Sequence, residues 1–108
     1  MNYKIVALED AEHDIKELKN YIVNNFSKEI WRKSYNKIKV AVADLKGNPL
    51  AGSIPPELHK FNLSQYRQII SGMNRIIYEV RKNIIYIHII ADQRRDMTSL
   101  VTTRLLRS

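Results

Sequence analysis

Cysteine is absent from this 108-residue sequence, and glycine and proline are scarce, at three residues each. Without cysteine, disulfides and thiolate zinc sites are excluded, and the composition fits a reducing cytoplasm. No apolar run approaches the roughly 20 residues that span a bilayer, and no basic region followed by an apolar core opens the chain. We therefore expect a cytoplasmic protein with no secretory signal and no membrane partner.

Motifs of several chemistries are missing as well. The sequence has no Gly-rich phosphate loop, no Gly-x-Ser-x-Gly elbow, and no histidines and carboxylates at metal-ligand spacing. His13 lies in an acidic stretch and is expected at the surface. His88 stands among isoleucines and is expected to be neutral and in the core or half buried. We therefore expect neither a metal nor a cofactor.

Positive charge is the main compositional signal, with a net charge of +7. Residues 1–46 hold nine basic and seven acidic side chains, whereas residues 47–108 hold nine basic and four acidic ones. Seven of the eight arginines lie in the second part. The planar guanidinium of arginine suits phosphate and carboxylate, so an anion-binding surface is expected in residues 47–108.

The first half of the chain has the apolar spacing of a strand followed by two helices. A strand is predicted at residues 3–8, and Asp10 and Ser27 are predicted N-caps of the helices. The apolar positions at helical spacing are Ala11, Ile15, Leu18 and Ile22, then Trp31, Tyr35, Ile38, Val42 and Leu45. The linker near Asn24-Asn25 is so short that the two helices must form an antiparallel hairpin.

The second half begins with a loop at residues 46–64, which holds all three prolines. Strands are predicted at residues 66–70, 73–80 and 84–90, and the last is apolar on both faces, as in a buried strand. A final helix carries Met97, Leu100, Val101 and Leu105, with Asp96 as its N-cap. The order indicates one α+β domain over residues 1–108: an N-terminal strand, a helical hairpin packed on an antiparallel β-meander, and a C-terminal helix.

Three segments of the chain carry a further pattern. They are Gly47-Asn48-Pro49-Leu50-Ala51-Gly52 with Glu57-Leu58, then Tyr66-Arg67-Gln68 leading to Asn74-Arg75-Ile76-Ile77-Tyr78-Glu79-Val80, and finally Arg94-Arg95-Asp96 with Arg104-Leu105-Leu106. In order and spacing, over nearly the whole chain, they resemble the RelE/ParE superfamily of toxins from bacterial type II toxin–antitoxin systems. The resemblance implies a small toxin of a plasmid-stabilisation module, which halts growth until a cognate antitoxin binds it.

This superfamily divides by target. RelE-like members cleave mRNA on the ribosome without a metal, whereas ParE-like members are described as poisons of DNA gyrase. Metal-free RNA cleavage needs convergent basic groups and a tyrosine or histidine of suitable pKa. Arg75 and Arg94 match the two arginines of the RelE-like pattern, but its strand lysines are missing and Leu100 stands near the position of its tyrosine. Tyr66, His59 or His88 would have to substitute.

The residue set therefore favours a ParE-like, non-catalytic inhibitor of gyrase, with a ribosome-dependent mRNA endoribonuclease as the alternative. The expected target-contacting residues are Arg67, Arg75, Arg94, Arg95, Arg104 and Arg107. Two interpretations in which these arginines have only a structural role remain open. Arg75 could face solvent and pair with Glu79, and the Arg94-Arg95 pair could form ion pairs with Asp92 or Asp96 at a helix start.

Three apolar side chains have no obvious place in the core. Two helices on one sheet leave some apolar surface over, and Tyr21, Phe26 and Ile30 belong to it. The resemblance implies that such a patch binds the antitoxin, whose C-terminal segment often folds on binding. Alternating apolar and basic surface suits an acidic amphipathic segment. The oligomeric state stays open, and a homodimer or a heterotetramer with the antitoxin both fit.

Overall fold

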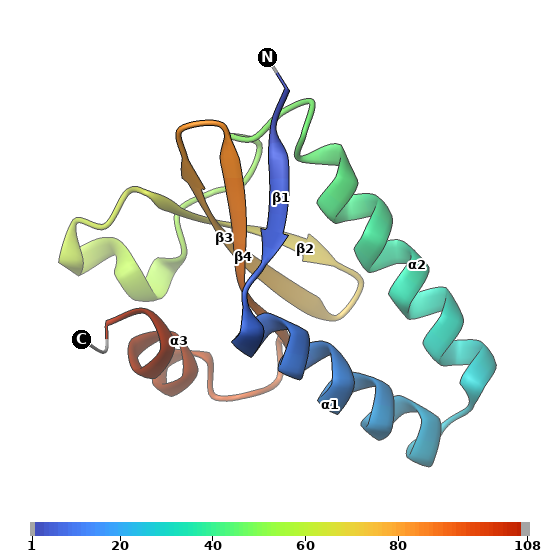
Figure 1. Ribbon diagram of the computed structural model, residues 1–108. Coiled ribbons are helices and arrows are strands. Elements are labelled where there is room, and N and C mark those ends of the chain that lie inside the picture. Colours follow the sequence, from blue (N-terminus) through green and yellow to red (C-terminus); the bar gives the residue numbers. More distant parts are fainter. Residues whose placement is uncertain (1, 107–108) are drawn as a thin grey trace.

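The computed structural model describes residues 2–106 and shows one sheet between two helical layers (Figure 1). The strands are β1 (Lys4–Ala7), β2 (Tyr66–Ser71), β3 (Asn74–Arg81) and β4 (Ile84–Asp92), in the order β1-β4-β3-β2. The hairpin of α1 (Glu9–Asn25) and α2 (Lys28–Asp44) covers one face. The 3₁₀ helix η1 (Pro56–Phe61) and α3 (Met97–Leu105) cover the other. The predicted α+β arrangement is confirmed.

Two of the three predicted helix caps are confirmed and one is wrong. Ser27 accepts a hydrogen bond from the Ile30 amide, and Asp96 accepts one from the Ser99 amide, both at 3.1 Å. Asp10 is not an N-cap, because α1 begins at Glu9 directly after Leu8. The cause is the sheet: the Leu8 amide still donates to the Ile87 carbonyl at 3.1 Å, so the helix follows the end of β1 without a linker.

The most apolar predicted strand, β4, lies between β1 and β3 and is buried on both faces. β1 pairs with it in parallel and β3 antiparallel. The β3 register skips one residue of β4, so that Ile77 faces Ile89 while Tyr78 faces Ile87, which makes His88 a bulge. Beyond the bulge, the β4 side chains that would have faced one side of the sheet face the other. Ile87 and Ile90 therefore pack under the hairpin, while Ile89 packs against η1 and α3.

The loop between α2 and η1 is fastened to the sheet by buried polar contacts. The Tyr78 hydroxyl donates to the Pro49 carbonyl at 2.7 Å and accepts from the Gly52 amide at 3.0 Å. Gly52 is required by this close approach, because an added Cβ would lie 2.4 Å from the Gln68 carbonyl oxygen. The loop is thereby held in place beside β2 and positions the segment that follows it, including η1.

None of the helices in the described residues 2–106 is long and apolar enough to cross a membrane.

Candidate functional site

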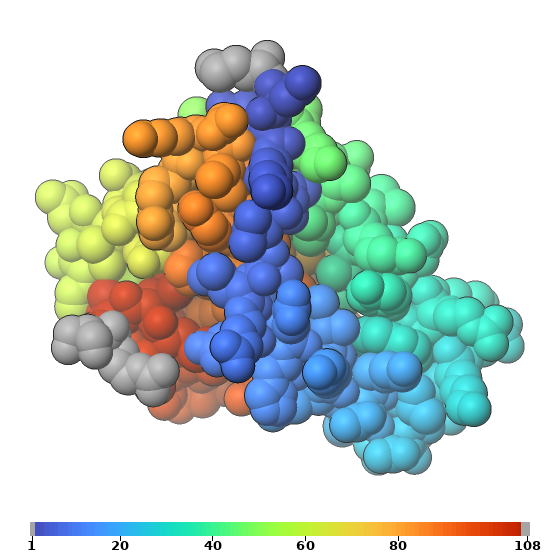
Figure 2. Space-filling view, in the orientation of Figure 1, coloured from blue at the N-terminus to red at the C-terminus, as the bar shows by residue number. Residues whose placement is uncertain are grey.

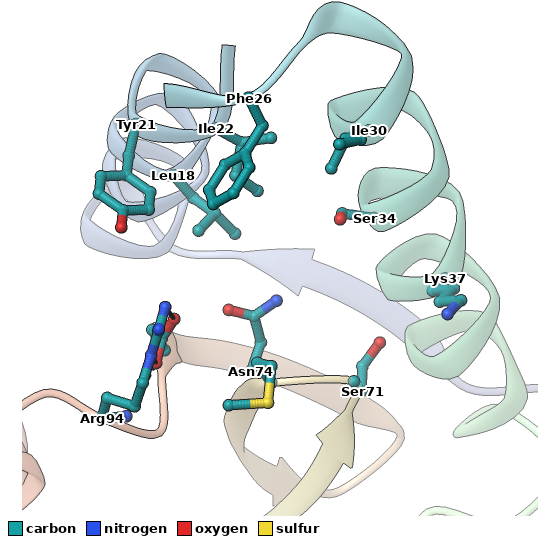
Figure 3. A pocket seen from close by; sticks show the side chains of 13 residues that line it. Leu18, Tyr21, Ile22, Phe26, Ile30, Ser34, Lys37, Ser71, Asn74 and Arg94 are labelled. Carbon is teal, nitrogen blue, oxygen red and sulfur yellow. Dashed lines mark hydrogen bonds and ion pairs between the residues drawn. The ribbon is translucent and has the colours of Figure 1, made fainter. Parts of the chain in front are cut away.

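A groove opens between the helical hairpin and the tight turn that joins β2 to β3 (Figure 3). Its volume is about 440 Å³. Side chains from α1 and α2 form one wall, and Ser71 and Asn74 form the other, with Arg94 at one side. Met73 of the β2–β3 turn also lines the groove. The hairpin side of the groove consists of Leu18, Tyr21, Ile22, Phe26, Ile30, Ser34 and Lys37.

The three residues predicted to bind a partner, Tyr21, Phe26 and Ile30, all line this groove. They are 49%, 61% and 44% exposed, and Met73 of the β2–β3 turn is 54% exposed. The hairpin tip that carries them projects beyond the sheet, at the lower right of Figure 2. Four large apolar side chains on one open hollow form the kind of patch that marks a partner site.

A second hollow of about 510 Å³ continues the groove along α1. The two hollows share Leu18, Tyr21, Asp92 and Arg94, and the second extends to Glu17 and Arg95. The combined surface, which we call the helix–sheet groove, is therefore an elongated channel and not a closed cavity. Its shape suits a segment of polypeptide better than a small molecule.

Arg94 and Arg95 lie at the edge of the helix–sheet groove, in the loop before α3. Arg94 donates to both carboxylate oxygens of Asp92, at 2.9 and 2.7 Å. This is the ion pair that the structural interpretation of Arg94 expected. This hydrogen bonding holds the pKa of Asp92 below its ordinary value of 3.8 and raises the pKa of Arg94. Both arginines are exposed, so their guanidinium groups can reach an anionic partner.

Arg75 does not face solvent and does not pair with Glu79, so the interpretation of Arg75 as a solvent-facing partner of Glu79 is wrong. It is 7% exposed, and its guanidinium donates to both carboxylate oxygens of Glu57 on η1 at 2.8 Å, while also contacting Gln68. The Arg75 hydrogen bonds hold the pKa of Glu57 below its ordinary value of 4.5 despite burial. This ion pair, which we call the Arg75–Glu57 clasp, fastens η1 to the sheet.

Arg104 is also engaged within the fold. It donates to both Asp14 oxygens, at 3.1 and 2.8 Å, and to the His88 carbonyl at 2.7 Å. The remaining acceptor capacity of Asp14 is used by the Ile90 amide at 3.1 Å, at a point where β1 has already ended. Asp14 therefore joins α1, β4 and α3. This contact is the Asp14 junction.

The other two predicted target residues are Arg67 and Arg107. Arg67 is half buried and donates to the Gly52 carbonyl at 2.8 Å, so it helps to hold the loop before η1. Arg107 lies outside the described residues. Of the six predicted target-contacting arginines, Arg94 and Arg95 are the ones placed with exposed side chains beside the helix–sheet groove.

The residues considered for RNA cleavage do not converge. Tyr66 pairs with Glu79 and Arg75 with Ile70, so Tyr66 and Arg75 are four positions apart along β3, about 13 Å. The Tyr66 ring instead packs edge-on against His88, with ring centroids 5.2 Å apart. Burial, with the nearby charge of Glu79, raises the pKa of Tyr66 above its ordinary 10.0, so less of the ionised form is present near neutral pH to act as a base.

His88 and His59 complete that set. His88 is half buried as predicted, with 16% of its side chain exposed and its Nε2 2.9 Å from Glu79. His59 is exposed on η1, beside a small hollow of about 100 Å³ that Arg75 does not line. Burial alone would raise the pKa of Glu79, but hydrogen bonds from Arg81 and His88 bring it below the ordinary 4.5. Glu79 thus acts as an acceptor within the fold.

Comparison with known proteins places the chain in a family. Residues 5–97 match the family described as the ParE toxin of the type II toxin–antitoxin system parDE. The chain belongs to the ParE toxin family. A solved structure described as the chromosomal ParDE toxin–antitoxin system from P. aeruginosa shares the fold, with a TM-score of 0.68 and 16% identity over 83% of this chain and 95% of that one. No curated protein matches.

As a ParE-family toxin, the chain is the toxin component of a toxin–antitoxin system, which implies an antitoxin as partner. The match ends at Met97, where α3 begins, so Arg104 lies beyond it. Among residues 2–106, no group of three or more histidines and carboxylates could hold a metal ion.

Sequence reasoning missed Asp14 and Asn74, two side chains that the fold of this ParE-family toxin buries. Asp14 stands on the apolar face of α1 between Ala11 and Ile15, and a carboxylate in an apolar stripe indicates a buried cationic partner. Asn74 shares the edge of the helix–sheet groove with the β2–β3 turn. Asn74 alternates with Ile76 and Tyr78 of the core, but no sequence signal indicated an open groove above it.

Proposed function

We propose that this ParE-family toxin arrests growth by binding DNA gyrase as a non-catalytic inhibitor, with Arg94 and Arg95 as its principal contacts. The observation that carries the proposal is the division of the arginines. Arg75 is buried in the Arg75–Glu57 clasp and stands apart from Tyr66. Arg95 and Arg94, the latter paired with Asp92, are exposed beside an elongated groove. Membership in the ParE family supports gyrase as the target.

A supercoiling assay with purified gyrase tests the target. Micromolar toxin is expected to inhibit supercoiling or to accumulate cleaved DNA. The double variant Arg94→Ala/Arg95→Ala is expected to need about tenfold more toxin, because arginines at the centre of an interface commonly contribute most of its binding energy. The readout is the toxin concentration that gives half-maximal inhibition.

The matched control is Arg32→Ala/Lys33→Ala, which removes the same charge from exposed positions of α2 outside the groove. It should leave the half-maximal concentration within about twofold, since isolated surface charges contribute little. Absence of inhibition by the wild-type toxin would exclude gyrase as the target. Primer extension on translated mRNA in the same arrested cells then tests the alternative, because cleavage between codon positions would identify a ribonuclease.

We also propose that the antitoxin neutralises the toxin by placing an acidic amphipathic segment in the helix–sheet groove. The exposed apolar side chains of Tyr21, Phe26 and Ile30 supply the surface that such a segment would bury. In the hollow nearest the hairpin tip, Arg94 and Asp92 neutralise each other, which leaves Lys37 as the unpaired charge among its lining residues. Together with the net charge of +7, this favours an acidic partner.

Ile30→Asp tests the groove. It is expected to weaken binding of the antitoxin encoded beside the toxin gene about 100-fold, because burial of the isoleucine is lost and a carboxylate then faces an acidic segment. Isothermal titration calorimetry measures the Kd, and co-expression shows whether the variant escapes neutralisation. Val40→Asp is the control, since Val40 is 52% exposed on α2 and does not line the groove. Equal weakening by both variants would exclude the groove as the binding site.

A further inference from the structure

Asn74 is an unusual residue for the floor of an apolar groove. It is the first residue of β3 and is 8% exposed, yet its side-chain oxygen accepts no hydrogen bond from any of the described residues 2–106. The side chain rises from the sheet toward α1 and α2, into the space bounded by Ile22, Phe26 and Ser34 (Figure 3). A buried amide oxygen without a protein donor is rare, because folding removes such a group from bulk water and normally supplies a partner in exchange.

Asn74 has Ser71 and Asp92 as its neighbours across the sheet. The hydroxyls of Ser71 and Ser34 line the same groove, yet neither donates to the Asn74 oxygen in the described residues 2–106. The terminal torsion of an asparagine is soft, so a small rotation can turn the oxygen toward the groove without disturbing β3. An occupant of the groove can therefore satisfy it at low cost in strain.

We propose that Asn74 determines which antitoxin this toxin accepts, by taking a hydrogen bond from a donor on the segment that fills the groove. The inference rests on the proposed antitoxin site and adds its selectivity. The segment that fits carries apolar side chains against Phe26 and Ile30 and places a hydroxyl, amide or backbone N–H over Asn74. An antitoxin with an aliphatic side chain there leaves the oxygen buried and unpaired, and sites of this type discriminate strongly.

The test compares Asn74→Leu and Asn74→Ala with the wild-type toxin. Both variants are expected to bind the antitoxin encoded beside the toxin gene about tenfold more weakly, which corresponds to one hydrogen bond formed in a buried site. The same variants, free of antitoxin, are expected to unfold at an unchanged or higher denaturant concentration, because the free toxin loses no hydrogen bond to this oxygen. A purely structural role predicts the opposite sign for stability.

Asn36→Leu is the matched control, since it makes the same chemical change on the exposed face of α2 outside the groove. Unchanged or tighter binding by both Asn74 variants would overturn the inference, as would a loss of stability that parallels the loss of binding. The outcome is separable from that of the groove itself. If wild-type toxin does not bind the antitoxin, or Ile30→Asp binds as wild type does, the proposed site fails; if only the Asn74 variants bind normally, the site stands and the selectivity fails.

Discussion

Replacing Glu57 with alanine is expected to lower the free energy of unfolding by about 3 kcal/mol, because it leaves the Arg75 guanidinium buried without its counter-ion. In the Arg75–Glu57 clasp, 8% of the Arg75 side chain and 15% of the Glu57 side chain are exposed, so the guanidinium has little contact with solvent. Urea denaturation followed by circular dichroism measures the loss. The expected structural result is release of η1 from the sheet, which increases proteolysis near residues 56–61.

The double variant Glu57→Leu/Arg75→Met separates the charge from the contact. Replacing both members of a buried ion pair with apolar side chains is often neutral or stabilising, so the double variant is expected to recover most of the stability. If Glu57→Ala and the double variant were equally unstable, packing and not the buried charge would explain the effect.

The Arg75–Glu57 clasp also makes the free energy of unfolding depend on pH. The folded pKa of Glu57 lies below its ordinary 4.5, so its contribution is complete above that pH and is lost as the pH falls through the folded pKa. The free energy of unfolding should therefore decrease from about pH 5 downward. Glu57→Gln should show a shallower decrease over the same range, and identical slopes for the two proteins would contradict the assignment.

Asp14→Ala is expected to lower the free energy of unfolding by a similar amount, about 3 kcal/mol. The reason is that the Asp14 carboxylate accepts hydrogen bonds from both the Ile90 amide and the Arg104 guanidinium. Removing the carboxylate leaves the Ile90 amide without its acceptor and removes two of the hydrogen bonds of Arg104, which keeps the His88 carbonyl and the more distant Asp10 as partners. The free energy of unfolding should fall, and hydrogen exchange at the Ile90 amide should accelerate more than at Ile87. These two readouts report the global and the local consequence separately.

Asp10→Ala is the matched control for the junction. Asp10 lies on α1, as Asp14 does, and its carboxylate is 3.6 Å from the Arg104 guanidinium. The Asp10 side chain, however, is 63% exposed. Exposed ion pairs contribute about 0–1 kcal/mol, so this variant should remain close to wild type. Comparable losses from Asp10→Ala and Asp14→Ala would mean that the charge of α1, and not the buried junction, holds α3.

Local patterns predicted the elements of this fold well because the apolar pattern of each element follows the face or faces that it buries. The helical spacing from Ala11 to Ile22 and the two-sided apolar run of β4 both reported burial directly. The bulge at His88 was not predictable, since it depends on how β3 is registered against β4 and not on the residues of either strand alone. The wrong cap at Asp10 has the same origin, because the sheet decides where α1 begins.

The candidate site was predicted in part, for a related reason. Tyr21, Phe26 and Ile30 were conspicuous because the apolar faces of the helices already accounted for the core without them. It was harder to predict which arginines are exposed, because the exposure of an arginine side chain depends on carboxylates that are distant in sequence. Arg75 meets Glu57 of η1, 18 residues earlier, and Arg104 meets Asp14 of α1, 90 residues earlier. Charge counts locate arginines in the sequence but not the carboxylates that bind them.

The parallel pairing of β1 with β4 has a consequence for how the chain is made. Lys4–Ala7 finds its partner only at Ile84–Ile87, and the strands between them are formed after both helices of the hairpin. On the ribosome, α1 and α2 therefore emerge with their apolar faces uncovered, and no sheet can close until most of the 108 residues are synthesised. The long loop closure also makes this contact slow to form. Synthesis itself thus delays the appearance of a folded toxin until β4 has been made.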